Sequence, residues 1–158
     1  MDFEELEQQI ESLYARKNYA QIKAILIELN PADIAVLLER FEPDRQALFF
    51  RLLPKEEAAE TFVQFDSDSQ EAIIKSFSDA ELREVLDELF LDDAVDIIEE
   101  MPASVVKRIL RNTDPQTRGA INALLEYPED SAGSIMTTEF VDLKRDLTVE
   151  DAFKRIRR

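Results

Sequence analysis

The stretch LDDAVDIIEE, residues 91–100, combines the two features on which the rest of the chain is built. Asp92 and Asp96 are four residues apart, so on a helix they lie on one face, about one turn from each other. The apolar side chains of the stretch fall on the other side, where they can pack on a neighbour: Ala94, Val95, Ile97 and Ile98. The pattern predicts an amphipathic helix with one acidic face and one buried face.

The sequence around this helix is strongly acidic. Residues 55–100 contain 16 Asp and Glu residues against three Lys and Arg, which is a net charge of −13 out of −16 for the whole chain. Two exposed carboxylates at the spacing of Asp92 and Asp96 repel each other at a cost of about 0.2–0.5 kcal/mol. We therefore expect a positively charged species to bind at this surface.

A helical repeat extends from this stretch in both directions. Pro31, Pro54, Ser78 and Pro102 recur at intervals of 23, 24 and 24 residues. Each opens a unit of two short amphipathic segments, and Pro, Ser or Asp stands at or near the start of each segment, as is typical of helix N-termini. Two further helices are predicted before the repeat, over residues 1–16 and 19–29. The fold class is therefore all-α, with about ten short helices stacked in pairs as a superhelix.

Composition excludes several classes of protein. The chain has 158 residues with no Cys and no His, which removes disulfides, thiolate metal sites, cysteine nucleophiles and the usual catalytic triads. The pI near 4.4 opposes binding to nucleic acid. No apolar run approaches the ~20 residues that span a bilayer, so we expect the fragment to be soluble. We do not expect an enzyme.

The helical pattern ends at Tyr127. Residues 127–138 read as a linker with turn residues, and residues 140–143 have a short β-like pattern. Thr148 is a predicted N-cap, with Asp151 at the third position of a helix over residues 149–158. We therefore predict a helical domain over 1–126, a linker over 127–138, and the truncated start of a second, α/β domain over 139–158.

The last residues carry a resemblance to a known family. YPEDSAGSIMT followed by TEFVDLKRDLTVEDAFKRIR resembles the entry into a CBS domain pair in the MgtE family of magnesium transporters and channels. The repeat LPKEEAAETF…LREVLDELFLDDAVDIIEEMP is similar to the acidic N domain of that family. The resemblance implies a right-handed superhelical N domain, two CBS domains and a transmembrane pore domain in one polypeptide. It also implies a homodimer and a position on the cytoplasmic side of the cell membrane.

The resemblance also implies a metal and its ligands. In the family, regulatory Mg²⁺ ions lie between the N domain and the CBS domains, and closure of the domains at high magnesium shuts the pore. By motif, Glu60 matches the N-domain glutamate, and Asp92 and Asp96 match its aspartate pair. The chemistry agrees, because Mg²⁺ prefers oxygen ligands, keeps several of its waters, and can bridge two acidic surfaces.

Simpler interpretations of these residues remain open. Asp92 could cap the helix that it begins, Asp96 could interact with the helix dipole, and Glu60 could be an ordinary exposed carboxylate. The main competing function is a helical-repeat scaffold for protein interactions, armadillo-like or motor-switch-like, with no response to Mg²⁺. A hydrolase with two carboxylates facing each other across a cleft of about 5–9.5 Å does not fit two aspartates on one helix face.

The fourth repeat unit differs in charge from the others. It carries a basic cluster, and residues 101–158 as a whole hold ten Lys and Arg against nine Asp and Glu. The cluster is either a solvated face or a docking surface for an acidic partner or another part of the same protein. Its residues are Lys107, Arg108, Arg111 and Arg118.

Overall fold

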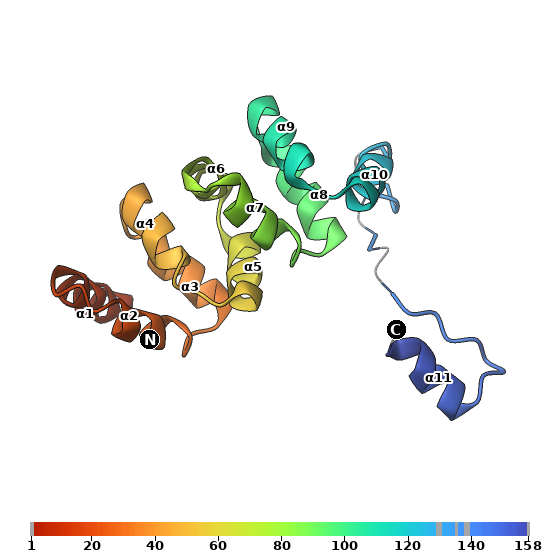
Figure 1. Cartoon of the computed structure of the whole chain (residues 1–158), viewed down its shortest axis with the longest axis horizontal. Coiled ribbons are helices and arrows are strands. Elements are labelled where there is room, and N and C mark those ends of the chain that lie inside the picture. Colours follow the sequence, from red (N-terminus) through yellow and green to blue (C-terminus); the bar gives the residue numbers. More distant parts are fainter. Residues whose placement is uncertain (1, 129–130, 135, 138–139, 158) are drawn as a thin grey trace.

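The computed structural model describes residues 2–128, 131–134, 136–137 and 140–157, and in these residues it contains eleven helices and no strand (Figure 1). The helices are α1 Phe3–Ala15, α2 Tyr19–Leu26, α3 Pro31–Leu38, α4 Pro43–Phe50, α5 Lys55–Gln64, α6 Ser67–Ser76, α7 Asp79–Leu86, α8 Leu91–Glu100, α9 Ala103–Asn112, α10 Pro115–Leu124 and α11 Val149–Ile156.

The predicted repeat is confirmed as four helix pairs, α3–α4 to α9–α10. Pro31 is the first residue of α3, and Pro54, Ser78 and Pro102 are the N-caps of α5, α7 and α9. The first helices of successive pairs pack on one another, α3 on α5, α5 on α7 and α7 on α9, while α4 packs on α6 and α8 on α10. Helices α1 and α2 cover the N-terminal end, where α1 contacts both α2 and α3. The handedness of the superhelix stays a prediction.

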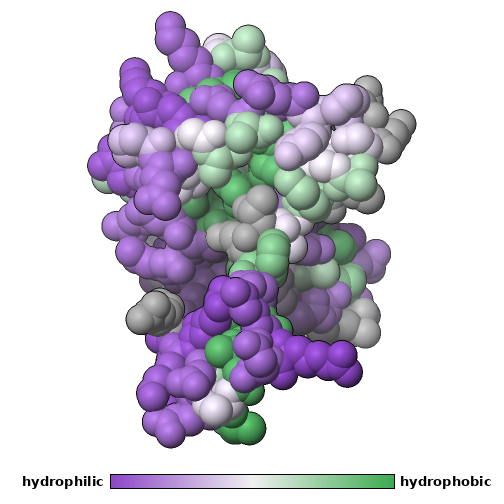
Figure 2. Space-filling model, turned by 90° about the vertical axis from the view of Figure 1, so that its right-hand side faces the viewer, coloured by the Kyte–Doolittle hydropathy of each residue, from purple (hydrophilic) through white to green (hydrophobic). Residues whose placement is uncertain are grey.

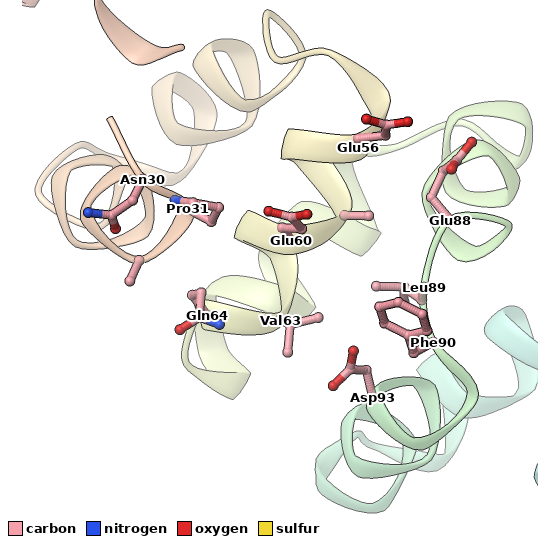
Figure 3. A pocket seen from close by; sticks show the side chains of 12 residues that line it. Asn30, Pro31, Glu56, Glu60, Val63, Gln64, Glu88, Leu89, Phe90 and Asp93 are labelled. Carbon is pink, nitrogen blue, oxygen red and sulfur yellow. The ribbon is translucent and has the colours of Figure 1, made fainter. Parts of the chain in front are cut away.

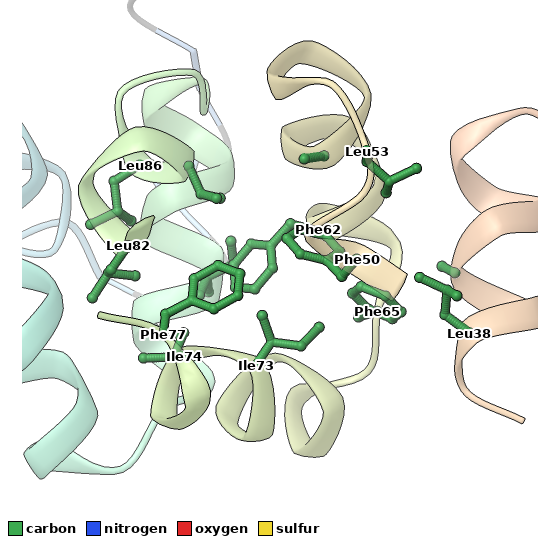
Figure 4. Close-up of a cluster of buried hydrophobic side chains, with 14 of the residues drawn as sticks. Leu38, Phe50, Leu53, Phe62, Phe65, Ile73, Ile74, Phe77, Leu82 and Leu86 are labelled. Atoms are coloured by element: carbon green, nitrogen blue, oxygen red, sulfur yellow. The ribbon is translucent and has the colours of Figure 1, made fainter. Parts of the chain in front are cut away.

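An aromatic cluster joins successive pairs in the middle of the stack (Figure 4). The buried ring of Phe50, at the end of α4, lies 6.1 Å from Phe62, 5.8 Å from Phe65 and 5.7 Å from Phe77 between ring centroids. Phe65 and Phe77 are the C-caps of α5 and α6, so the ends of three helices meet here. Burying each such side chain contributes about 1.5–3 kcal/mol, so this cluster helps to hold successive repeats together.

Two predicted helix ends differ from the structure. The second helix ends at Leu26 rather than Leu29, because the chain tightens into a turn in which the Leu29 amide donates to the Leu26 carbonyl at 3.0 Å. The first helix begins at Phe3, after the N-cap Asp2. The predicted terminal residues Met1 and Arg158 lie outside the described residues.

The segment after Tyr127 is partly as predicted. Thr148 caps α11 by accepting a hydrogen bond from the Asp151 amide at 3.2 Å, which confirms the predicted cap. The predicted strand over residues 140–143 is wrong, because a strand needs a partner and no other strand is present in the part of the chain that the structure describes. Figure 1 shows α11 beyond the stack, and the described residues between α10 and α11 form no helix. Residues 138 and 139, at the predicted boundary between linker and second domain, are outside the described residues.

Candidate metal-binding surface

Helix α8 carries the predicted aspartate pair. Its apolar face is buried as predicted, which turns the other face outward: Leu91, Ala94, Val95, Ile97 and Ile98 are buried. Asp92 is half-buried and Asp96 is exposed. The four-residue spacing places both carboxylates on the outward side, one turn apart.

The structure bears on the simpler interpretations of this pair. The N-cap of α8 is Phe90, so Asp92 lies inside the first turn of the helix and is not its N-cap residue. Asp92 and Asp93 are in the first turn, where the helix dipole favours negative charge, whereas Asp96 lies beyond that turn. The dipole therefore gives Asp96 little stabilisation, and its exposed charge has no structural role of that kind.

Glu60 lies in a different part of the surface from the aspartate pair. It is exposed on α5 and lines a hollow of about 670 Å³ between the start of α3, α5 and the α7–α8 connection (Figure 3). Three more carboxylates line this hollow, which we call the acidic groove: Glu56, Glu88 and Asp93. Asp93, next to Asp92 in the chain, lines the groove with Glu60, whereas Asp92 and Asp96 are not among its lining residues.

Sequence reasoning thus missed three of the four carboxylates of the groove. Glu56 could have been found, because it is four residues before Glu60 and shares its helix face. Glu88 and Asp93 come from the connection and the first turn of the next pair, and only the packing of α5 on α7 reveals their position. Phe90, 63% exposed, adds an aromatic side chain to the same groove.

Most nearby cations are engaged away from these carboxylates, in ion pairs that link successive helix pairs. Arg51 contacts Glu81 at 2.8 Å, Lys55 contacts Glu84 at 3.5 Å, and Arg111 contacts Asp79 at 2.9 Å. Within the part of the chain that the structure describes, no ion pair involves Glu56, Glu60, Glu88, Asp92 or Asp96. The negative charge of these five carboxylates is therefore not neutralised by an ion pair with a described residue.

Two of the linking carboxylates, Glu81 and Asp79, have a lowered pKa. Hydrogen bonds from Ser78, first from its backbone amide, together with Arg51, lower the pKa of Glu81 to about 2. The Arg108 guanidinium, with Arg111, lowers the pKa of Asp79. These two groups are fixed structural anions, and they are not available to a ligand.

The donor set of the acidic surface suits a hydrated hard cation. Among the described residues, no three Asp, Glu, His or Cys side chains converge closely enough to enclose a metal ion. An ion enclosed by protein ligands on all sides therefore does not fit these residues alone. Mg²⁺ retains its waters and is held through one or two carboxylates, so Glu60, or Asp92 with Asp96, could hold it on one side through water.

Comparison with known proteins places the chain in a family. Residues 29–130 match the model of the MgtE intracellular N domain. The magnesium transporter MgtE of Thermus thermophilus is 31% identical over 141 residues, which is 87% of this chain and 31% of that protein. The MgtE of Bacillus subtilis is 22% identical over 157 residues, or 99% of this chain and 35% of that protein. The chain thus spans about a third of the length of these relatives.

Solved structures show the same fold. The crystal structure of the cytosolic domain of the Mg²⁺ channel MgtE in complex with ATP matches 96% of this chain and 62% of that one, with a TM-score of 0.83 and 30% identity. The soluble part of a magnesium transporter matches 99% of this chain and 62% of that one, with a TM-score of 0.82 and 21% identity.

The named relatives are transporters rather than enzymes. No helix in the described part of this chain is long and apolar enough to cross a bilayer. The all-helical stack, its acidic surface and the match over residues 29–130 lead to one conclusion: the chain belongs to the MgtE intracellular N domain family.

Proposed function

We propose that this chain is the Mg²⁺-sensing regulatory domain of a magnesium transporter or channel, on the cytoplasmic side of the membrane. Its acidic surface, with Glu60, Asp92 and Asp96, binds Mg²⁺ at an interface with CBS domains of the same polypeptide and thereby gates ion flux. The observation that carries the proposal is that these three carboxylates are half-buried or exposed and make no ion pair with any described residue, in a member of the MgtE N domain family.

The mechanism follows from electrostatics. Without a cation, the uncompensated carboxylates repel a second acidic surface, which keeps the domains apart. A hydrated Mg²⁺ between the surfaces screens this repulsion and supplies water-mediated contacts on both sides. Cation concentration thus biases an open–closed equilibrium, and the closed state transmits the signal to the pore domain. A homodimer of the parent protein would carry two such domains.

The test is Mg²⁺ flux through the parent protein in liposomes, measured as Mg²⁺ is raised on the side that carries this domain. We expect flux to fall as Mg²⁺ rises, and Asp92→Asn/Asp96→Asn to need more Mg²⁺ for the same inhibition. A matched control, Asp44→Asn/Asp68→Asn, removes two exposed carboxylates from the first turns of α4 and α6 and should behave as wild type. Equal Mg²⁺ sensitivity of all three proteins would reject the proposal.

A second candidate function is a protein-interaction scaffold. The exposed side chain of Phe90, beside the acidic groove, favours it, because helical stacks bind partners through such grooves. If the chain is a scaffold, Phe90→Ser should weaken its binding to a partner, and Mg²⁺ should have no effect on that binding. The flux experiment therefore separates the two functions.

A further inference from the structure

The last helix pair has a basic groove that the Mg²⁺ proposal does not use. The groove has a volume of about 660 Å³ and runs along α9 to the start of α10. Apolar side chains form its floor and three cations lie around it. We call it the end groove, and its lining residues are Met101, Ala103, Val106, Lys107, Leu110, Arg111 and Arg118.

The groove lies beside the buried stripe of α9, at the edge of the core. Val105, Ile109 and Asn112 form the buried stripe of this helix. At 100° per residue, Val106 and Leu110 fall well outside that stripe, toward the opposite side, and both are only half-buried. Helix α9 thus has a second apolar stripe that the stack covers only in part.

The place of α9 in the stack explains this stripe. The series of first helices runs from α3 through α5 and α7 to α9, and no further first helix follows among the described residues. A stacked repeat normally buries its outer face on the next repeat, and terminal repeats need a polar outer face instead. Helix α1, at the N-terminal end, exposes mainly polar side chains, among them Glu4, Glu5 and Gln8. Figure 2, which views the other end, shows hydrophobic atoms at the surface among hydrophilic ones.

The charged side chains around the groove are all positive, and they are only partly engaged in ion pairs and hydrogen bonds within the protein. Lys107 is exposed and makes no ion pair with a described residue. Arg118 donates through Nη2 to the Thr113 carbonyl at 2.8 Å, while its buried Nε has no hydrogen-bond partner. Arg111 contacts Asp79, yet its side chain is 67% exposed. An acidic occupant would therefore find the charge of Lys107, unpaired within the described residues, and the exposed guanidinium of Arg111 beside an apolar floor.

Three other occupants fit less well. A second copy of the chain, and an anionic bilayer, would both meet the net charge of −16, most of it in residues 55–100. Helix α11 has an exposed apolar side chain at Phe153, but its neighbours Lys154 and Arg155 carry the wrong sign of charge.

We propose that the end groove binds an acidic amphipathic helix of a partner protein. The helix packs on α9 as the first helix of a fifth pair would, with its apolar side chains on Val106 and Leu110. Its Asp and Glu side chains pair with Lys107 and Arg118. This proposal requires no Mg²⁺ and stands apart from the sensing function.

The test uses the 158-residue chain and a synthetic peptide of about 15 residues, a length at which an isolated helix begins to be stable. The peptide has Leu at helical spacing of three and four and Glu on both flanks; a second peptide has Lys in place of each Glu. Affinity is measured by fluorescence anisotropy, and the site is mapped by amide chemical shifts. We expect the acidic peptide to bind, to shift amides of α9 and α10, and to bind more weakly as salt is raised.

Matched variants sharpen the result. Lys107→Glu should weaken binding of the acidic peptide by about 3- to 10-fold. Lys23→Glu, at an exposed lysine of α2 far along the chain, should leave it unchanged. Leu110→Ala should also weaken binding of the acidic peptide, but the salt dependence should stay as in the wild type because no charge is removed. The proposal is overturned if the amide shifts lie elsewhere, if the two lysine variants behave alike, or if the Lys-flanked peptide binds as tightly.

Discussion

Two regions of the molecule begin their helices in the same way but bury them very differently. Helix α7 in the stack is capped by the Ser78 side chain, and α11 near the C-terminus is capped by the Thr148 side chain. Helix α7 buries three apolar side chains, whereas α11 buries none. The comparison teaches that local sequence decides where a helix begins, while its burial depends on a neighbouring helix pair.

The aromatic residues of the two regions should show the largest difference in stability. Phe62 is 1% exposed in the stack and Phe153 is 53% exposed on α11. Phe62→Ala should lower the free energy of unfolding by about 3–5 kcal/mol, because it leaves a cavity in the aromatic cluster. Phe153→Ala should change it by less than about 0.5 kcal/mol. Urea unfolding followed by circular dichroism measures both, and similar losses would show that α11 is packed after all.

The second-largest difference is expected between the helix caps Ser78 and Thr148, in their effect on global stability. Ser78 and Glu81 form a capping box, in which the Ser78 amide donates to Glu81 at 2.7 Å. Ser78→Ala should cost about 1 kcal/mol of global stability. Thr148→Ala should leave the unfolding midpoint of the stack unchanged and reduce only the helicity of α11, which carbon chemical shifts report. A lower midpoint in the Thr148 variant would mean that the two regions unfold together.

The stack should also contain an interaction that weakens at low pH, between the Glu81 carboxylate and its partners Ser78 and Arg51. The folded pKa of Glu81 is about 2, below the usual value of 4.5, so its stabilising effect is complete above about 4.5 and is lost as pH falls toward 2. Its side chain is 40% exposed, so solvent screening reduces the effect to about 0.5–1 kcal/mol. Glu81→Gln should therefore be less stable than wild type at neutral pH, and the difference should disappear near pH 2.

The control for this link is on the same helix. Glu84 pairs with Lys55 at 3.5 Å, and both side chains are 60% exposed. Glu84→Gln should change stability less than Glu81→Gln at neutral pH. A difference between wild type and Glu81→Gln that stays constant with pH would contradict the role of the Glu81 charge.

The smallest expected effect concerns the acidic surface itself. Asp96→Asn should raise the free energy of unfolding by about 0.2–0.5 kcal/mol without divalent cations, because it removes repulsion between Asp92 and Asp96. The gain should shrink at high salt. Glu150, on α11, pairs with Lys154 at 2.8 Å, and Glu150→Gln should give no gain. A loss of stability in Asp96→Asn would indicate a partner for this carboxylate that repulsion alone does not explain.

The fold was predictable to the extent that it is local and periodic. The spacing of Pro31, Pro54, Ser78 and Pro102 predicts the four pairs, and Thr148 predicts the start of α11. The predicted strand over residues 140–143 is not formed, since strand formation depends on a neighbouring strand and the segment's own pattern could not show that one is absent from the described part of the chain.

The candidate site was predictable only in part. The outward position of Asp92 and Asp96 follows from the buried stripe of α8. The meeting of Glu60 with Glu88 and Asp93 does not, because these residues come from different helix pairs and their distance is set by packing. Sequence patterns therefore identified the acidic face, and the structure divided it into the acidic groove and the aspartate pair.

The most direct test of the account is the compactness of the parent polypeptide, from this domain through its predicted CBS domains, as Mg²⁺ is titrated. Small-angle scattering would follow the radius of gyration, with monovalent salt at matched ionic strength as the control for screening. The account predicts a decrease with Mg²⁺ beyond that of the salt control, and a weaker decrease in Asp92→Ala/Asp96→Ala. A radius of gyration that responds equally to Mg²⁺ and to monovalent salt would contradict Mg²⁺ sensing by this domain and leave the scaffold function in its place.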